Sequence, residues 1–256
     1  MSFTTASEIL KQAALLDVPS IKLNWRGESH LNPYFFEITE LAKELGFVDR
    51  ISNSNFNFAI SREDIFWAFS NQTTVKISFD SFYKDVFLAQ RKGADVDRIM
   101  DNIDKFYHYP KRKNKIIIQM VRTEANKNEN FEKYVNRLWP NAYLSVRDCV
   151  PNRVGGGDNH TVLDLSTLER RPCLQAFARL IFAHDGQATC CCPDIETRLL
   201  GPKHNIHTMS ISEIWNSEAM KLIRRDLKSG RKFKMPVCQN CSSLESYEGY
   251  QPNWNS

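Results

Sequence analysis

Six of the seven cysteines in this 256-residue chain fall between Cys173 and Cys241. The total is odd, and the segment from Met1 to Leu16 lacks the basic start, apolar stretch and small-residue cleavage site of a secretory signal peptide. We therefore expect a cytoplasmic protein with reduced thiols rather than a disulfide-bonded one. Clustered thiolates in a reducing compartment predict a metal site.

The chain changes character after residue 150. Pro151 and the Gly155-Gly156-Gly157-Asp158 run predict a linker over residues 151–172, between a large domain at 1–150 and a small one at 173–256. In the small domain, Asp185-Gly186 favours a β-hairpin turn between 179–184 and 187–192. Ser210 with Glu213 has the spacing of a capping box, which predicts a helix there with a break near Asn216.

Three groups of cysteines in the small domain have the spacing of a metal site. Cys238 and Cys241 are two residues apart, so a tight turn can aim both sulfurs at one ion or cluster, and Cys173 precedes the hairpin. The run Cys190–Cys192 is expected on a strand, where successive side chains point to opposite faces, so only part of the run can bind. The sequence therefore predicts a four-thiolate site with one residue of the run, and such a site suits zinc or an iron-sulfur cluster.

The first 147 residues alternate between strand-like and helix-like stretches. Residues 35–45 carry apolar side chains at helical spacing and stop before Gly46, and Thr5 with Glu8 predicts a capped first helix. Residues 115–122 contain an Ile-Ile-Ile run, typical of a strand buried on both faces. Such repeats predict an α/β fold, an incomplete parallel β/α barrel of about five to six βα units, because each parallel pairing needs a crossover. The other expected strands are 21–25, 47–52, 75–80 and 142–147, and the other expected helices are 61–69, 83–91, 96–107 and 128–138.

The order of features in the small domain resembles the SPASM or twitch domain of radical S-adenosylmethionine (AdoMet) enzymes. Those features are Cys173, Gly-x-x-x-x-Cys ending at Cys191, the Ser-Ile-Ser-Glu-Ile-Trp segment 210–215, and Cys238-x-x-Cys241. The resemblance implies one auxiliary 4Fe-4S cluster and selects Cys191 from the triple. Its implied ligands are Cys173, Cys191, Cys238 and Cys241. The longer cysteine series of full SPASM domains is absent after Cys241, so the resemblance is to the shorter, four-cysteine type.

The N-terminal domain is also similar to the radical AdoMet core. Arg26-Gly27-Glu28-Ser29 corresponds to the family's Gly-Gly-Glu-Pro, which contacts the AdoMet amino group, and Arg91 stands where an arginine often meets the AdoMet carboxylate. Ile51-Ser52-Asn53 and Ile77-Ser78-Phe79-Asp80 resemble the motifs of the next two strand ends. The resemblance thus implies AdoMet as a cofactor. The residues implied to contact it are Gly27, Glu28, Ser52, Asn53, Ser78 and Arg91.

The chain departs from the family in one respect. The signature CxxxCxxC, whose thiolates hold the AdoMet-cleaving cluster, belongs before the first helix, and no cysteine precedes Cys149. A cluster with an open iron needs these thiolates, and the radical chemistry belongs to that cofactor. We therefore expect no AdoMet cleavage by this chain alone, and we interpret it as a fragment, half of a split enzyme or a degenerate relative.

The leading hypothesis is an iron-sulfur protein related to enzymes that modify a peptide or small metabolite by hydrogen abstraction. Its expected partners are that substrate, a reductant protein and a second chain that supplies the CxxxCxxC segment. The alternative is a non-enzymatic module whose four cysteines hold structural zinc. The charge balance, 34 basic against 30 acidic residues, gives no reason to expect nucleic acid. Apolar runs of only a few residues predict no membrane partner.

Overall fold

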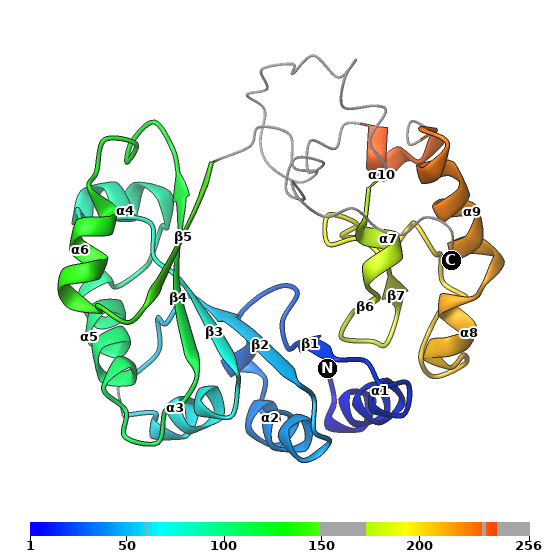
Figure 1. Ribbon diagram of the computed structural model, residues 1–256, viewed down its shortest axis with the longest axis horizontal. Coiled ribbons are helices and arrows are strands. Elements are labelled where there is room, and N and C mark those ends of the chain that lie inside the picture. Colours follow the sequence, from blue (N-terminus) through cyan, green and yellow to red (C-terminus); the bar gives the residue numbers. More distant parts are fainter. Residues whose placement is uncertain (60, 149–172, 232–233, 240–256) are drawn as a thin grey trace. The chain divides into compact units, whose positions relative to one another are not determined.

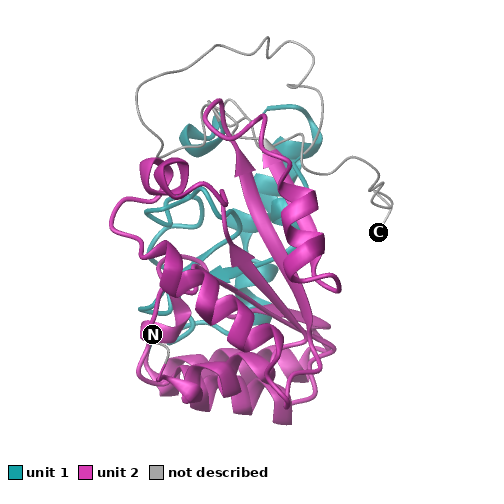
Figure 2. Cartoon of the chain, turned by 90° about the vertical axis from the view of Figure 1, so that its left-hand side faces the viewer, with its two compact units in different colours: residues 1, 150–256 teal, residues 2–149 magenta. Residues whose placement is uncertain are grey.

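The computed structural model describes residues 1–59, 61–148, 173–231 and 234–239 (Figure 1). It divides into two compact units, Ser2–Cys149 and Val150–Ser256, the latter together with Met1 (Figure 2). Each unit is described by itself below. The predicted linker at 151–172 lies outside the described residues.

The N-terminal unit is built on one parallel sheet with the strand order β1-β2-β3-β4-β5. Consecutive strands are neighbours throughout, as in a β/α barrel that has not closed. The predicted incomplete parallel barrel is therefore confirmed. The strands are β1 (Ser20–Lys22), β2 (Asp49–Ser54), β3 (Thr74–Ser78), β4 (Lys115–Arg122) and β5 (Tyr143–Asp148).

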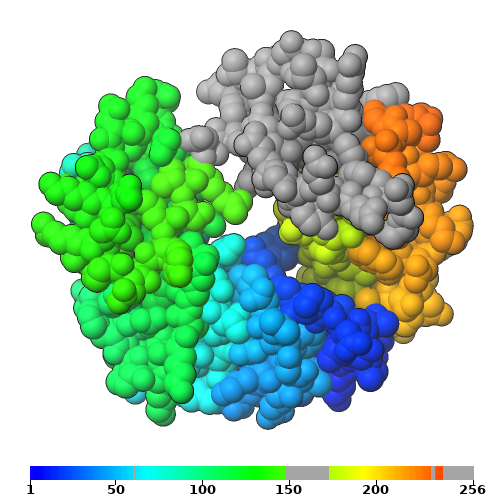
Figure 3. Space-filling model, viewed as in Figure 1, coloured from blue at the N-terminus to red at the C-terminus, as the bar shows by residue number. Residues whose placement is uncertain are grey.

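In the described part of the unit, α1 precedes the first strand, and five further α-helices and one short 3-10 helix connect the strands; Figure 1 shows the α-helices along one side of the sheet. Helices α1 and α2 contact each other, and they lie side by side in the blue part of Figure 3. The helices are α1 (Phe3–Leu15), η1 (Ser29–Leu31), α2 (Phe35–Glu44), α3 (Glu63–Ser70), α4 (Lys84–Gln90), α5 (Val96–Tyr107) and α6 (Phe131–Leu138).

The two faces of the sheet differ in burial. In β4, Ile116, Ile118 and Met120 are buried among side chains of the helices, whereas Ile117 and Gln119 on the opposite face are only partly buried. The expectation of a strand buried on both faces was therefore wrong, because the helices cover a single face. The other face carries partly buried side chains, both apolar, such as Ile117, and polar, such as Gln119.

Aromatic rings fill the space between the sheet and its helices. Phe56 and Phe69 stack with ring centroids 5.2 Å apart, and Phe106 lies 5.5 Å from Phe56. Phe56 follows β2 with a positive φ of 57°, and the buried amide of Asn102 donates hydrogen bonds of 2.8 and 2.7 Å to the carbonyls of Phe56 and Phe58. Helix α5 thereby fixes the loop that leaves the carboxyl end of β2.

Two predicted helix starts were wrong. The cap of α1 is Ser2, whose side chain accepts a hydrogen bond from the Thr5 amide, so the helix begins before the expected Thr5. Helix α3 begins at Glu63 without a side-chain cap, later than the expected start at Ser61, a residue at capping spacing from Asp64. In both places a nearby Ser or Thr at capping spacing misled the prediction, because such residues also occur in loops and first turns.

The C-terminal unit contains a small antiparallel hairpin and several short helices. Gly186 lies in the predicted turn with a φ of +82°, and an added Cβ would lie 2.7 Å from the Ile206 side chain, so glycine is required. Ser210 and Glu213 form the predicted capping box, and the helix breaks at Asn216 as expected. The elements are α7 (Gln175–Ala178), β6 (Ile181–Phe182), β7 (Ala188–Thr189), α8 (Ile211–Trp215), α9 (Glu218–Lys228) and α10 (Pro236–Gln239).

Among the described residues, no helix combines the length and the apolar character that crossing a bilayer requires.

Candidate functional site

The three adjacent cysteines lie beyond the hairpin rather than on it. Strand β7 ends at Thr189, so Cys190 already belongs to the following loop. The premise that strand alternation separates Cys191 from its neighbours was therefore wrong. Burial separates them instead: Cys190 is 1% exposed and Cys191 is 9% exposed, whereas Cys192 is exposed. The two buried thiols are the ones available to an internal site.

A buried carboxylate shapes the loop that carries these thiols. Asp194 is 1% exposed, and its carboxylate accepts a 2.7 Å hydrogen bond from the Thr189 hydroxyl. It also accepts hydrogen bonds from the amides of Arg198 and Leu199, at 2.9 and 3.0 Å. Asp194 thus ties the end of β7 to the far side of the loop and fixes the course of the chain between them.

The described cysteines of the unit lie in one neighbourhood. Cys190 belongs to the core of this unit, and Cys173 and Cys238 pack against the same core. Burial raises the pKa of the Cys190 thiol to about 12 and that of Cys191 still further, and the nearby thiols of Cys173 and Cys238 raise both. Two predicted ligands, Cys173 and Cys238, therefore lie within electrostatic range of a third, Cys191.

The fourth predicted ligand, Cys241, lies outside the described residues. In the part of the chain that the structure describes, no three His, Cys, Asp or Glu side chains are gathered closely enough to hold one metal ion. The donor set nevertheless fits a soft metal centre. Buried thiols with raised pKa values stay protonated in an apolar site, and a bound cation deprotonates them.

In the N-terminal unit, Glu28 lies where the chain leaves β1, next to the carboxyl end of β2. Its carboxylate accepts hydrogen bonds of 2.9 Å from the Ser54 hydroxyl and 3.0 Å from the Asn55 amide. Burial raises the pKa of Glu28, although these two donors and the positive charge of Arg91 oppose the shift. The preceding Gly27 has a φ of +67°, a conformation that favours glycine. Glu28 is thus a positioned carboxylate, 21% exposed.

Arg91 follows α4 and is held by a carboxylate from the end of β3. Its Nε donates a 2.6 Å hydrogen bond to Asp80, which is buried and also accepts from the Val121 amide at 2.8 Å. Because Arg91 also acts electrostatically on Glu28, the structure brings this predicted pair into one region above the strand ends. One acidic and one basic group in this region suit a ligand that carries both charges.

The remaining AdoMet candidates lie on different faces of the sheet. Ser52 is fully buried on the helix-covered face, and its hydroxyl has no hydrogen-bond partner among the described residues. Asn53, next along β2, lies on the opposite face, as does Ser78 in β3. Ser78 pairs with Gln119 of β4, and Gln119 pairs with Ser145 of β5, so a polar row crosses the open face.

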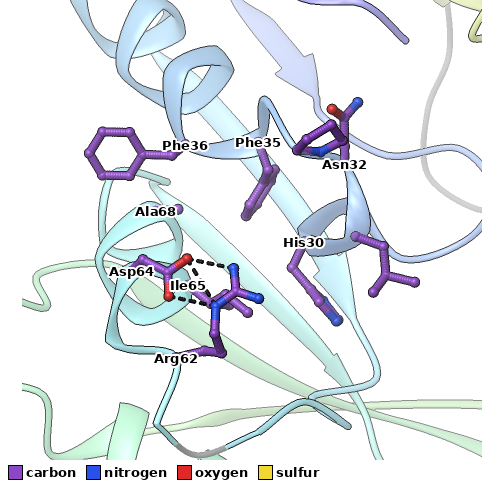
Figure 4. Close-up of a pocket in the computed structure, with 10 residues that line it drawn as sticks. His30, Asn32, Phe35, Phe36, Arg62, Asp64, Ile65 and Ala68 are labelled. Atoms are coloured by element: carbon purple, nitrogen blue, oxygen red, sulfur yellow. Dashed lines mark hydrogen bonds and ion pairs between the residues drawn. The ribbon is translucent and has the colours of Figure 1, made fainter.

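A hollow of about 210 Å³ lies between η1, α2 and α3 (Figure 4). His30 lines it, and burial followed by the charge of Arg62 lowers the pKa of His30 to about 4, so the imidazole is neutral at physiological pH. Arg62 forms an exposed ion pair with Asp64 at 2.6 Å on the other side of the hollow. None of the predicted AdoMet contacts lines this hollow.

The C-terminal residues match a known family. Residues 173–242 match the model of the SPASM family, described as an iron-sulfur cluster-binding domain. This match spans all four predicted ligands, Cys241 included. The C-terminal unit carries a SPASM domain.

Solved structures of radical AdoMet enzymes share the fold of the chain. BtrN in complex with AdoMet and 2-DOIA matches with a TM-score of 0.60 at 17% identity, over 94% of this chain and 80% of BtrN. BtrN in an open conformation matches with a TM-score of 0.55 at 15% identity, with the same coverage. The enzyme anSMEcpe with bound AdoMet matches with a TM-score of 0.60 at 13% identity, over 94% of this chain and 79% of anSMEcpe. At these identities the likeness establishes the fold alone. No curated protein sequence matches the chain.

Sequence reasoning did not single out three residues that organise these sites. Asp80 was noted only as part of a strand motif, although it holds Arg91. Asp194, which shapes the cysteine loop, follows the Cys-Cys-Cys-Pro run in a way that suggests a turn at most. Arg224 belongs to no sequence motif, yet its guanidinium is hydrogen-bonded to the carbonyls of Ala176 and Trp215 inside the SPASM unit.

Proposed function

We propose that the chain binds one auxiliary 4Fe-4S cluster through Cys173, Cys191, Cys238 and Cys241. The observation that carries this proposal is the common neighbourhood of Cys173, Cys190, Cys191 and Cys238 inside a SPASM domain. Four thiolates complete the ligand set of such a cluster, which when bound supplies one-electron redox chemistry. The exposed Cys192 is not a ligand in this proposal.

The protein's own contribution at this site is to hold the thiols and to exclude water. Asp194 fixes the loop between β7 and Leu199 through hydrogen bonds to both ends, so Cys191 is presented from a rigid segment. Cys190 is buried in the core beside it and shields the site from solvent. A dry environment and fixed ligand positions favour a thiolate-bound centre over free thiols.

For the N-terminal unit we propose outer contacts to AdoMet. Glu28 would receive the amino group and Arg91 the carboxylate, because the two side chains are opposite in charge and positioned by Ser54, Asn55 and Asp80. Gly27, Ser52, Asn53 and Ser78 are the remaining proposed contacts. Asn53 and Ser78 lie on the open face of the sheet, whereas Ser52 would take part through its position in the β2 backbone.

The function that these sites support best is modification of a peptide or small metabolite by hydrogen abstraction, in a radical AdoMet-like system. Such a system needs an electron donor, so we propose a reductant protein as a partner. It also needs the CxxxCxxC thiolates, supplied in the same protein or by a second chain, since residues 1–148 contain no cysteine. The polar row formed by Ser78, Gln119 and Ser145 supports a substrate with hydrogen-bonding groups.

The second candidate function is a non-enzymatic module with structural zinc at the same four cysteines. The observation that favours it is the burial of the thiols, since structural zinc sites are closed and all four positions are filled by protein ligands. Both candidates use one site and differ in the metal that fills it.

Metal analysis after anaerobic purification and reconstitution tests the proposal. We expect a brown protein with about four irons and four sulfides per chain, the content of a single 4Fe-4S cluster. A colourless protein with one tightly bound zinc would support the second candidate and contradict the first. Cys192→Ala is the matched control for Cys191→Ala, because the two residues are adjacent and only Cys191 is a proposed ligand.

A further inference from the structure

Arg224 of α9 points its guanidinium into the SPASM unit and not into solvent. The group lies over the Trp215 ring, with 4.0 Å between the guanidinium carbon and the ring centroid. Its Nε donates a 3.0 Å hydrogen bond to the carbonyl of Ala176, and its Nη1 donates a 2.9 Å hydrogen bond to the carbonyl of Trp215. Two fixed acceptors and a stacked ring leave the planar group a single orientation.

The third nitrogen of this guanidinium has no acceptor among the described residues. Nη2 of Arg224 is buried, and it makes no hydrogen bond. Burying a charged hydrogen-bond donor without an acceptor costs free energy of folding. Such a donor in a native protein therefore indicates that an acceptor binds there. Because the guanidinium group is planar and rigid, the hydrogen bonds of Nε and Nη1 determine where the acceptor of Nη2 can lie.

The side chains around this guanidinium belong to the cysteine site. Ala176, whose carbonyl anchors Nε, shares a buried core with Cys190, and Trp215, Cys173 and Cys238 pack against that core. Burial lowers the pKa of Arg224, and the thiol group of Cys190, when ionised, raises it. Arg224 is thus a cation in electrostatic range of Cys190, the neighbour of the proposed ligand Cys191.

We propose that Nη2 of Arg224 donates a hydrogen bond to an iron-bound sulfur of the site, a ligand thiolate or a sulfide of the cluster. Anionic sulfur is the acceptor that the unpartnered donor lacks. This inference rests on the proposed function, because it requires an iron-sulfur cluster at the four cysteines. Hydrogen bonds to the sulfurs of such clusters help to set their reduction potentials, so Arg224 acts as a positioning residue that makes the cluster easier to reduce.

The same helix provides a matched control. Arg225 is the next residue in α9, its side chain is 66% exposed, and its nearest described carboxylate oxygen belongs to Asp226 at 3.9 Å. Arg225→Lys therefore makes the same chemical change, in the same helix, on the solvent side. Both Lys variants keep the positive charge, so a difference between them reports the loss of the guanidinium contact.

The experiment uses the full chain with ¹⁵N in its arginine guanidinium groups, reconstituted with iron and sulfide and then reduced. Pulsed electron paramagnetic resonance should detect a ¹⁵N hyperfine coupling to the reduced cluster in the wild type. The coupling should be lost in Arg224→Lys and kept in Arg225→Lys. A redox titration should show a more negative midpoint potential for Arg224→Lys and an unchanged one for Arg225→Lys.

A third variant, Cys190→Ala, identifies the acceptor. Iron and the ¹⁵N coupling should both be retained, because Cys190 is not a proposed ligand, and the acceptor is then a sulfide or a thiolate of the proposed ligands. Retained iron with a lost coupling would overturn the proposal, because Cys190 would then receive the bond without binding iron.

The wild-type spectrum tests the inference even if Arg224→Lys fails to fold. A brown wild-type protein with a full iron and sulfide content but no ¹⁵N coupling would overturn this inference and leave the proposed function intact. A wild type that binds no iron and sulfide would overturn both.

Discussion

The two units of the chain are stabilised by different means. The described core of the N-terminal unit contains nine phenylalanines and one tryptophan, packed between a five-stranded sheet and its helices. The described core of the C-terminal unit contains no aromatic residue, and its sheet has two strands of two residues each. Large apolar side chains stabilise the first unit by burial, whereas the second has a small core with Cys190 inside it. We therefore expect this small unit to depend on its proposed metal centre for stability.

The largest expected effect comes from removing a proposed ligand. Cys191→Ala should lose most of the iron and sulfide, because it removes one of the four thiolates that complete the proposed ligand set of the cluster. It should also make residues 173–239 sensitive to proteolysis while residues 2–148 stay resistant. Iron and sulfide analysis and limited proteolysis measure the two effects.

Cys192→Ala and Cys190→Ala are the comparisons for this variant. We expect both to keep their iron largely intact, since Cys192 is exposed and neither is a proposed ligand. Equal loss of iron in all three variants would contradict the choice of Cys191. Uniform protease resistance with and without the metal would contradict the dependence of this unit on its metal.

The next effect concerns the N-terminal core alone. Phe106 is fully buried against Phe56, Phe66 and Phe69, so Phe106→Ala should destabilise this unit by about 3–5 kcal/mol through lost burial and a residual cavity. Denaturant unfolding followed by near-ultraviolet circular dichroism measures this loss, with the exposed Leu15→Ala as control. If the iron content fell together with the stability, the separation between the two units would be wrong.

A smaller effect depends on pH and also belongs to the N-terminal unit. Because burial lowers the pKa of His30 from 6.5 to about 4, the unfolded chain takes up a proton between these values and the folded unit does not. Stability from neutral His30 is therefore complete above pH 6.5 and decreases as the pH falls towards 4, by about 3 kcal/mol.

His30→Gln should remove this pH dependence. The raised pKa of Glu28 acts in the opposite direction, so the test compares the wild type and His30→Gln at each pH. Urea unfolding between pH 7 and 4 should show a steeper loss of stability in the wild type. Parallel curves for the two proteins would mean that His30 is accessible to protons in the folded unit.

The smallest effect is local to the C-terminal unit. Ser210 caps α8, with its hydroxyl accepting from the Glu213 amide at 3.2 Å and the Glu213 carboxylate accepting from the Ser210 amide at 2.7 Å. Ser210→Ala should cost about 1 kcal/mol. We expect a lower melting temperature for the metal-free protein in this unit only, and no change for the exposed Ser212→Ala. A shift of similar size in the N-terminal unit would show that the two units unfold together.

Local sequence patterns predicted those helices, strands and turns that depend only on residues close together in the sequence. The spacing of apolar residues gave α5 and β4 with their observed bounds, because in each the pattern starts and stops at the ends of the element. The capping box of α8 and the glycine turn of the hairpin were also predicted correctly, since each depends on residues close in sequence. Where two side chains compete for one cap, as Ser2 and Thr5 do, the pattern alone selected the wrong one.

The sites were predictable only where they form sequence motifs. The cysteines are spaced in a motif, so their grouping was foreseen, although the loop that carries Cys191 was mistaken for a strand. The role of Arg224 could not be foreseen, because its acceptors are the carbonyls of Ala176, 48 residues earlier, and Trp215. The other basic residues of α9, Lys221, Arg225 and Lys228, are exposed, so only the folded unit reveals which arginine points inwards.

Hydrogen-deuterium exchange with mass spectrometry, on metal-loaded and metal-free protein, tests most directly whether the C-terminal unit is folded around a four-thiolate centre. We expect removal of the metal to increase exchange strongly in peptides from residues 173–239, most of all around Cys190 and Cys191. Exchange in peptides from residues 2–148 should stay unchanged, because the aromatic core of that unit does not involve the cysteines. Unchanged exchange in 173–239 after complete metal removal would contradict the account.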